Sequence, residues 1–245
     1  MSFTSIPGRV LSRALVWLGT ELLRKQAQIA KQSLPRFANS PKSLTIELPW
    51  RILNPECIFW GDDVWIGPGA FITAQRRYPS RSLAHPHQRH EAQTFSPGIQ
   101  FGHRVSCSGN LVIGAAQRVT IGDDVMFASN VTLLDNFHGF DDAHIPYKYQ
   151  PLWRIAPVEV KRGCWIGQNV VIMPGVVIGE MSIVGANSVV TESLPDRVIA
   201  VGAPARVIKR WDDDRHEWVS CSPRALATFN SERREFDRKG QKRFP

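Results

Sequence analysis

The sequence predicts an all-β solenoid, a parallel β-helix in which a short repeat coils upon itself. Three observations predict it: aliphatic or small residues recur every six positions, glycine often follows them, and a second series lies four residues further on. A period of six fits neither an isolated strand nor a helix. It fits a chain that makes a short strand, turns and repeats, so that equivalent side chains stack. The clearest run contains Val160, Ile166, Ile172, Ile178, Val184 and Val190, and its companion series contains Cys164, Val170, Val176, Ser182 and Ser188.

Two earlier stretches keep the same frame. Residues 46–72 hold the first repeats, and residues 98–137 hold a second run. The frame slips by two residues between Leu111 and Val119 and then resumes. Three runs in phase therefore predict one continuous stack.

Two segments leave the frame and are expected to protrude from the stack as loops. These are residues 73–97, which are polar and hold three of the histidines, and residues 138–157. Long loops in a compact body often carry function. We expect the catalytic body to span residues 46–205, with both loops inserted into it.

The two ends of the chain are predicted to be helical. Residues 9–33 carry a leucine stripe at helical spacing, and Pro35 ends it. Within the N-terminal segment 1–45, this helix either lies on an anionic membrane or packs on its own body or a neighbouring subunit. The C-terminal segment 206–245 is expected to be a short polar, helical tail.

Charge is segregated along the chain, whose net charge is +8. Residues 1–45 carry +6, residues 46–205 carry −2 and residues 206–245 carry +4. The repeats lack the basic groove with stacking aromatics that nucleic-acid binding requires, so we expect no nucleic-acid partner.

The four cysteines show no metal-binding spacing and are expected to be free thiols in a reducing compartment. No stretch approaches the ~20 apolar residues of a membrane span. The N-terminus lacks the features of a signal peptide. These observations favour a cytoplasmic protein, with peripheral membrane contact through residues 9–33 as one alternative.

Residues 46–210 resemble the hexapeptide-repeat O-acetyltransferases. These include galactoside and maltose acetyltransferases and the sugar acetyltransferases of capsule, exopolysaccharide and O-antigen synthesis. The motifs that carry the resemblance are IGQNVVIMPGVVIG from Ile166, VGANSVVT from Val184 and VGAPARVIK from Val201. The resemblance implies a left-handed parallel β-helix, a homotrimer, and active sites in grooves between subunits.

The same resemblance places the catalytic histidine at His138, in the segment DNFHGF. Asn136 stands where the polysaccharide branch often has a further histidine. A sugar hydroxyl attacking a thioester needs a base, and imidazole, with a pKa of about 6.5, suits that role near neutral pH. No cysteine stands where a nucleophile is expected, so direct transfer is favoured over an acyl-enzyme.

Further positions follow from the resemblance. The acyl donor is expected to be acetyl-CoA, with no metal. Its expected contacts are Gln168, Ala186, Thr191, Pro204, Arg206 and Lys209, of which the two cations suit the CoA phosphates. The acceptor, a sugar or lipid-linked sugar, is expected to contact Ser108, Asn110 and Asp135. An asparagine stacked on its equivalents, such as Asn110, can instead hydrogen-bond to the backbone of a turn. On the turn where the frame slips, this chain has Ala116 where the family can have an aspartate.

Three alternatives remain open from the sequence. An N-acetyltransferase acting on an amino sugar would use the same fold and base. A carbonic anhydrase of the γ type would need three histidines around zinc. His103 and His138 could be two of them, but His85, His87 and His90 lie together in an out-of-frame loop. A non-enzymatic scaffold would have no need of His138 together with the CoA-contact pattern.

Overall fold

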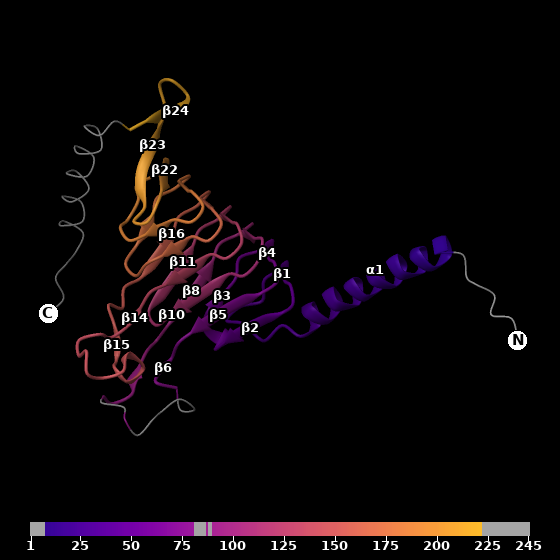
Figure 1. Ribbon diagram of the computed structural model, residues 1–245, viewed down its shortest axis with the longest axis horizontal. Helices are drawn as coiled ribbons and strands as arrows, with labels where there is room; N and C mark the ends of the chain where they lie inside the picture. Colours follow the sequence, from indigo (N-terminus) through magenta and orange to yellow (C-terminus); the bar gives the residue numbers. More distant parts are fainter. Residues whose placement is uncertain (1–7, 81–86, 88–89, 222–245) are drawn as a thin grey trace, which may run out of the picture.

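Three long sheets form the body of the molecule, and the chain visits them in rotation (Figure 1). The computed structural model describes residues 8–80, 87 and 90–221. The first sheet contains β1 (Leu44–Ile46), β4 (Val64–Ile66), β9 (Ser106–Cys107), β12 (Met126–Phe127), β17 (Trp165–Ile166), β20 (Ile183–Val184), β22 (Val198–Val201), β23 (Arg206–Asp212) and β24 (Glu217–Ser220). The second contains β2 (Trp50–Leu53), β5 (Ala70–Ala74), β10 (Val112–Ala115), β13 (Thr132–Leu134), β18 (Val171–Ile172) and β21 (Val189–Val190). The third contains β3 (Ile58–Phe59), β8 (Gly98–Phe101), β11 (Arg118–Ile121), β16 (Val158–Val160) and β19 (Val177–Ile178).

Successive coils pair in parallel, as the period of six predicts. We call one circuit of three strands a coil and the turn between two sheets a corner. Ile166, Ile172 and Ile178 lie in the first, second and third sheets, and all three are fully buried. The companion series, Val170, Val176, Ser182 and their equivalents, is buried as well. The six-residue frame is therefore confirmed, because each repeat contributes inward-facing side chains to one continuous core.

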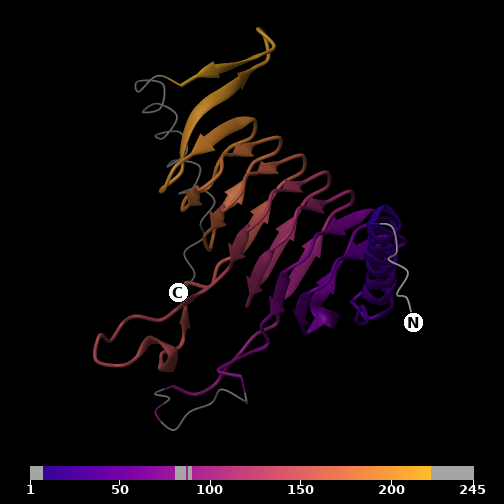
Figure 2. The same cartoon turned by 45° about the vertical axis from the view of Figure 1, so that its right-hand side comes forward.

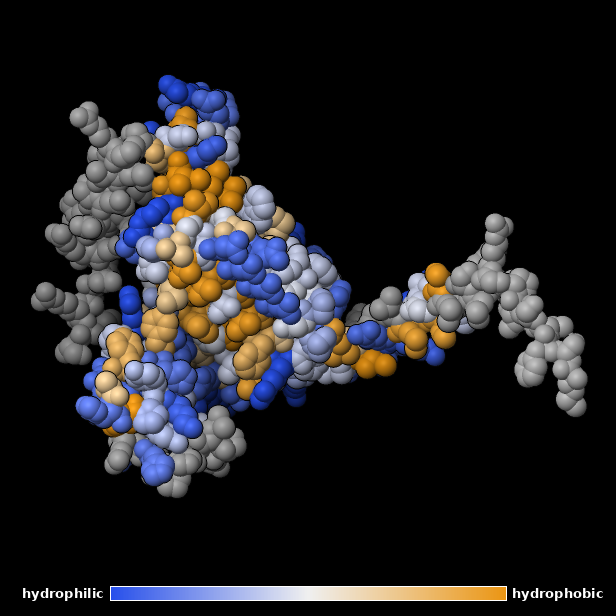
Figure 3. All heavy atoms as spheres, in the orientation of Figure 1, coloured by the Kyte–Doolittle hydropathy of each residue, from blue (hydrophilic) through white to orange (hydrophobic). Residues whose placement is uncertain are grey.

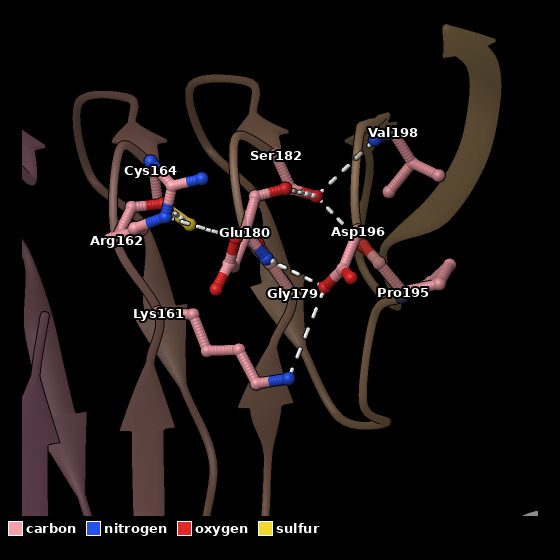
Figure 4. Close-up of polar contacts among 9 residues, drawn as sticks. All are labelled: Lys161, Arg162, Cys164, Gly179, Glu180, Ser182, Pro195, Asp196 and Val198. Carbon is pink, nitrogen blue, oxygen red and sulfur yellow. Dashed lines mark hydrogen bonds and ion pairs between the residues drawn. The ribbon is translucent and has the colours of Figure 1, made fainter.

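Polar side chains inside the stack are satisfied at the corner between the third and first sheets (Figure 4). The hydroxyl of the buried Ser182 donates to the carbonyl of Pro195 at 2.7 Å and accepts from the N–H of Val198 at 3.2 Å. Beside it, the N–H of Glu180 donates to the carboxylate of Asp196 at 2.8 Å. Buried polar groups are tolerated when they are hydrogen-bonded in this way, which explains serine at a core position of the repeat.

The N-terminal helix α1 (Gly8–Gln32) is confirmed, and it projects away from the stack (Figure 1, Figure 2). Trp17 and Leu22 are 65% and 59% exposed. Ala30 is buried where the helix reaches the body. Leu18 and Leu22 of the predicted leucine stripe, 49% and 59% exposed, therefore do not pack on the protein's own β-helix, while packing on a neighbouring subunit stays a prediction. Among the described residues, no helix is long and apolar enough to cross a membrane.

The C-terminal prediction needs a correction. Residues 206–220 form two strands joined by a turn: β23 pairs antiparallel with β22, and β24 pairs antiparallel with β23. The rings of Trp211 and Trp218 meet across this hairpin with centroids 5.5 Å apart. Polar composition suggested a helix, but cross-strand aromatic pairing and an open sheet edge favour strands. The remaining tail, residues 222–245, lies outside the described residues.

Candidate active site

Both out-of-frame segments leave the stack at the corner between the second and third sheets. The first joins β5 to β8 and contains the antiparallel strands β6 (Arg77–Tyr78) and β7 (Gln93–Thr94). The second joins β13 to β16 and contains β14 (Phe137–His138) and β15 (Leu152–Trp153). We call these segments the first and second hairpins. They extend from the same side of the stack in both views (Figure 1, Figure 2).

The two hairpins are hydrogen-bonded to each other. The side-chain amide of Gln93 binds both backbone groups of Leu152: it accepts from the N–H at 2.7 Å and donates to the carbonyl at 3.1 Å. Tyr78, Ala116 and Leu152 form a small buried cluster beneath this contact. The second hairpin is thus held in place by the first, and both rest on the turn between β10 and β11.

His138 lies on the second hairpin, opposite Leu152 in the β14–β15 pair, and is exposed. Its Nδ1 is 3.0 Å from the hydroxyl of Tyr78, which comes from the first hairpin. The same hydroxyl donates to the carbonyl of Lys148 at 2.8 Å. Among the described residues, Nε2 of His138 has no hydrogen-bond partner. One nitrogen of the imidazole is therefore held by protein, and the other has no partner within the described part of the chain.

Asp135 has a different environment from the one expected of an acceptor contact. It is fully buried, and its carboxylate accepts backbone N–H groups from Ala116, Gln117 and Arg118, each at 2.7 Å. The side chain of Asn136 donates to it as well, at 2.8 Å. This carboxylate therefore holds the turn at which the six-residue frame slips. With four donors and no exposed surface, it has no oxygen for a substrate, and we leave it out of the acceptor-binding set.

Asn110 belongs to a ladder of asparagines at the corner between the first and second sheets. Its amide donates to Asn130, Asn130 donates to Asn169, and Asn169 donates to Asn187, at 2.8, 2.9 and 2.9 Å. All four have positive φ, which asparagine tolerates better than most residues. Asn110 therefore stabilises the turn, which is the role that the sequence left open for it. Ser108 is exposed at the same corner and remains a predicted acceptor contact.

Gln168 and Ala186 are exposed at this same corner, one coil apart. The N–H of Asn187 donates to the carbonyl of Gln168 at 2.8 Å. A Cβ on Gly167 would lie 2.7 Å from the backbone nitrogen of Ala186, so only glycine allows the two coils to approach so closely. This explains why glycine often follows the core residue of a repeat. The two predicted CoA positions therefore stack directly on each other.

Thr191 and Pro204 lie beside the last strand of the second sheet. Thr191 follows β21 at the corner from which the hairpins leave. In the second sheet, β21 is two strands away from β13, which precedes the hairpin of His138, so the two corners are about 10 Å apart along the stack. The turn containing Pro204 is hydrogen-bonded to Val189 through Gly202 and Ala205, at 3.0 and 2.8 Å. The predicted CoA positions therefore border the upper part of the second sheet, whose corner also carries His138.

A β-bulge aligns the two predicted phosphate-binding cations. Residues three apart on a regular strand face opposite sides. In β23, however, Lys209 pairs with Ile199 and Arg206 pairs with Val201, with one extra residue, Ile208, between the two registers. Directly paired residues share a face, and Ile199 and Val201 share one on β22. The bulge therefore puts Arg206 and Lys209 on the same face.

The other candidate groups lie elsewhere. His103 is at the corner between the third and first sheets, where its Nδ1 accepts from the N–H of Asp62 at 3.0 Å. It thus lies at a different corner from His138. Among the described residues, no three metal-ligating side chains lie close together. The four cysteines are free, as predicted, and burial raises the pKa of Cys107 and Cys164 to about 11.

Sequence reasoning missed Tyr78 and Gln93. Both lie in the first out-of-frame segment, where the repeat gives no register from which a position can be inferred. Their partners, His138 and Leu152, are 60 and 59 residues further on. The one available signal was that two segments left the frame at the same corner of the repeat.

Comparison with known proteins identifies the repeats. Residues 157–192 match the family model "Bacterial transferase hexapeptide (six repeats)". The chain is 38% identical over 124 residues to a galactoside O-acetyltransferase of Escherichia coli K12, covering 50% of this chain and 60% of that protein. It is 35% identical over 127 residues to WbbJ, a putative lipopolysaccharide biosynthesis O-acetyl transferase of the same organism, covering 49% of this chain and 64% of that protein. The chain thus spans less than two thirds of the length of these relatives.

The fold is similar to that of AntD, an N-acyltransferase from Bacillus cereus solved with dTDP and 3-hydroxybutyryl-CoA. That likeness has a TM-score of 0.56 at 21% identity and covers 89% of this chain and 96% of that chain. At this identity it concerns the fold. Residues 157–192 are bacterial transferase hexapeptide repeats, and the resemblance to the hexapeptide-repeat acetyltransferases that the sequence predicts is confirmed.

Proposed function

We propose that this protein is an acetyl-CoA-dependent acetyltransferase that acetylates a hydroxyl of a sugar, with His138 as general base. The observation that carries the proposal is the state of the His138 ring: Nδ1 is engaged by Tyr78, and Nε2 has no partner among the described residues. Relatives named O-acetyltransferases, at 38% and 35% identity, support the reaction class. The name of the second, a putative lipopolysaccharide biosynthesis enzyme, supports a role in polysaccharide biosynthesis.

The proposed reaction is direct transfer within a complex of enzyme, acetyl-CoA and acceptor. The acceptor oxygen attacks the thioester carbonyl carbon while the imidazole takes the hydroxyl proton. The tetrahedral intermediate then collapses, the C–S bond breaks, and the imidazolium returns its proton to the departing CoA sulfur. A backbone N–H from a corner turn would stabilise the oxyanion. Because Cys107 and Cys164 are buried with a pKa of about 11, neither suits the role of an acyl-accepting thiolate.

Assembly is part of the proposal. We propose that the β-helix is left-handed and that three copies associate, so that each groove is completed by a neighbouring subunit. Apolar side chains on the outer face of the first sheet support association: Met126 pairs with Trp165, and Ser106 lies between Met126 and Trp65 in the same register. Trp65, Met126 and Trp165 are 40%, 46% and 47% exposed. Exposed apolar side chains grouped in this way are typical of interfaces.

A turnover screen tests the activity. Purified protein is mixed with acetyl-CoA and nucleotide sugars, lipid-linked sugars or simple glycosides, and the release of CoA thiol is followed. We expect release that depends on one acceptor class. Amino sugars belong in the same screen, because activity confined to them would favour N-acetylation. A folded, CoA-binding protein that is inactive on every class would contradict the proposal.

The two cations on β23 should contact the 3′-phosphate of CoA. Arg206→Ala and Lys209→Ala should each weaken CoA binding by about five- to tenfold, as expected when an exposed ion pair to phosphate is lost. Dephospho-CoA should bind both variants about as well as it binds the wild type. Arg210→Ala is the matched control, because Arg210 pairs with Val198, whose face is opposite to that of Lys209. Equal losses for both ligands, measured by calorimetry, would place these cations away from the phosphate.

We propose that α1 binds the surface of an anionic membrane and holds the enzyme at the inner face of the cytoplasmic membrane, near a lipid-linked acceptor. Hydrophobic residues are visible along its described part (Figure 3), and the exposed apolar side chains of α1 include those of Trp17 and Leu22. Residues 1–45 carry +6, and each basic residue near such a surface contributes about 1 kcal/mol. Free cysteines, which suit a reducing compartment, support the cytoplasmic placement.

Liposome flotation tests this role of α1. Wild-type protein should float with anionic vesicles, less so at high salt, while a variant with Trp17→Gln and Leu22→Gln, or one lacking residues 1–40, should stay in solution. All should be trimers by light scattering: about three times 27.6 kDa for the two full-length proteins, and three times its own smaller subunit mass for the truncated one. If the wild type fails to float and the variants lose their assembly, α1 packs between subunits instead.

A further inference from the structure

The hydroxyl of Tyr78 has two partners and one proton. It lies 2.8 Å from the carbonyl oxygen of Lys148 and 3.0 Å from Nδ1 of His138. A carbonyl oxygen only accepts hydrogen bonds, so the phenolic proton must point at Lys148 for that contact to be favourable. The phenolic oxygen then presents a lone pair to His138. Both contacts are hydrogen bonds at once only if Nδ1 itself carries a hydrogen.

We propose that Tyr78 is a positioning residue that holds His138 in its Nδ1–H tautomer, so that Nε2 is the atom that takes the proton of the acceptor. The inference rests on the proposed function in one respect: it takes His138 to be the base. In the opposite tautomer, Nε2 carries a hydrogen and cannot accept another. The Tyr78 hydroxyl would then have to donate its single proton to Nδ1, and its hydrogen bond to the Lys148 carbonyl would be lost.

The surroundings of Tyr78 suit this role. Its side chain is 8% exposed and packs with Ala116 and Leu152. Its ring meets the imidazole edge-on, with centroids 5.2 Å apart and planes at 68°. Burial raises the pKa of Tyr78, so the phenol keeps the proton that it donates. The tyrosine is therefore a rigid, neutral donor and acceptor between the two hairpins.

The Gln93–Leu152 contact keeps this arrangement in register. Leu152 is the strand partner of His138, and its backbone N–H and carbonyl are hydrogen-bonded to the side chain of Gln93. In the β6–β7 pair, Gln93 is directly opposite Tyr78. One pair on the first hairpin, Tyr78 and Gln93, thus binds one pair on the second, His138 and Leu152. Four residues fix both the position of the imidazole and the hydrogen on its Nδ1.

The direct test is nitrogen NMR of the histidine rings in the full-length protein labelled with ¹⁵N-histidine. Spectra are recorded at a pH where imidazole is neutral, and His138→Gln identifies the resonances of His138 among the seven histidines. In the wild type, we expect Nδ1 of His138 to show the shift of a protonated ring nitrogen and Nε2 that of an unprotonated one. The reverse pattern would overturn the proposal, and this measurement needs no variant of Tyr78.

Tyr78→Phe supplies the second test, because it keeps the ring and removes the hydroxyl. We expect loss of the Nδ1–H preference and a fall in kcat of about 10- to 100-fold, with the KM for acetyl-CoA changed by less than about twofold. Tyr147→Phe is the control, since Tyr147 is on the second hairpin and 57% exposed, and it should leave both readouts unchanged. If Tyr78→Phe keeps the wild-type tautomer, the proposal is wrong.

The two readouts separate this inference from the proposed function. If the wild type transfers acetyl groups but His138 is protonated on Nε2, the positioning role of Tyr78 fails and the activity stands. If no acceptor is acetylated but the Nδ1–H tautomer is found and is lost in Tyr78→Phe, the role of Tyr78 in setting the tautomer stands and the general-base assignment fails.

Discussion

Replacement of His138 by alanine should lower kcat by about 10²–10⁴-fold, with little change in CoA affinity. The size follows from the usual contribution of a general base, and the unchanged affinity follows because the predicted CoA contacts lie elsewhere along the stack. Steady-state kinetics with the acceptor found in the screen, together with calorimetry of CoA binding, measure the two effects separately.

His144→Ala is the matched control for this experiment. His144 lies on the second hairpin, is exposed, and donates its backbone N–H to the side chain of Asp142 at 2.7 Å. That contact does not involve its ring, so the hairpin should keep its shape. We expect near-normal turnover. A folded His138→Ala variant with normal turnover, beside an inactive His144→Ala variant, would move the base to His144.

The largest effect on stability is expected at Asp135. Asp135→Ala should lower the free energy of unfolding by about 3–5 kcal/mol, because the backbone N–H groups of Ala116, Gln117 and Arg118 lose their acceptor. Asp135→Asn should also destabilise the fold. Each carboxylate oxygen accepts two of the four donors, so an amide would turn one NH₂ group toward two N–H donors.

Urea or thermal unfolding followed by circular dichroism measures this loss. Asp141→Ala provides the comparison, since Asp141 is an exposed aspartate on the second hairpin and its removal should change stability by about 0.5 kcal/mol or less. An Asp135→Ala variant as stable as the wild type would show that the carboxylate does not hold the slipped turn.

The sequence was sufficient to predict the stack because its signal is repeated. Each coil places side chains such as Ile166 and Ile172 in the same core, so an error at one position is corrected by its neighbours in the period. The slip between Leu111 and Val119 was also visible. Its cause was not, because Asp135 reaches that turn from the next coil, 17 to 19 residues further along the chain.

The contacts around His138 could not be predicted, because they depend on how two irregular hairpins meet. The pairing of Tyr78 with His138 joins segments outside the repeat, and no periodicity relates them. The bulge that aligns Arg206 with Lys209 was hidden for a similar reason. Spacing alone places these residues on opposite faces, and the extra residue appears only in the register with β22.

Analysis of the reaction product tests the central claim most directly. Protein, acetyl-CoA labelled in its acetyl group and the active acceptor are incubated together, and the sugar product is examined by mass spectrometry before and after mild alkaline treatment. Our account predicts a singly acetylated sugar whose label is released by base, as expected for an ester, and a far slower appearance of this product with His138→Ala. A base-stable acetyl group would show an amide, and unlabelled sugar from a folded, CoA-binding enzyme would contradict acetyl transfer itself.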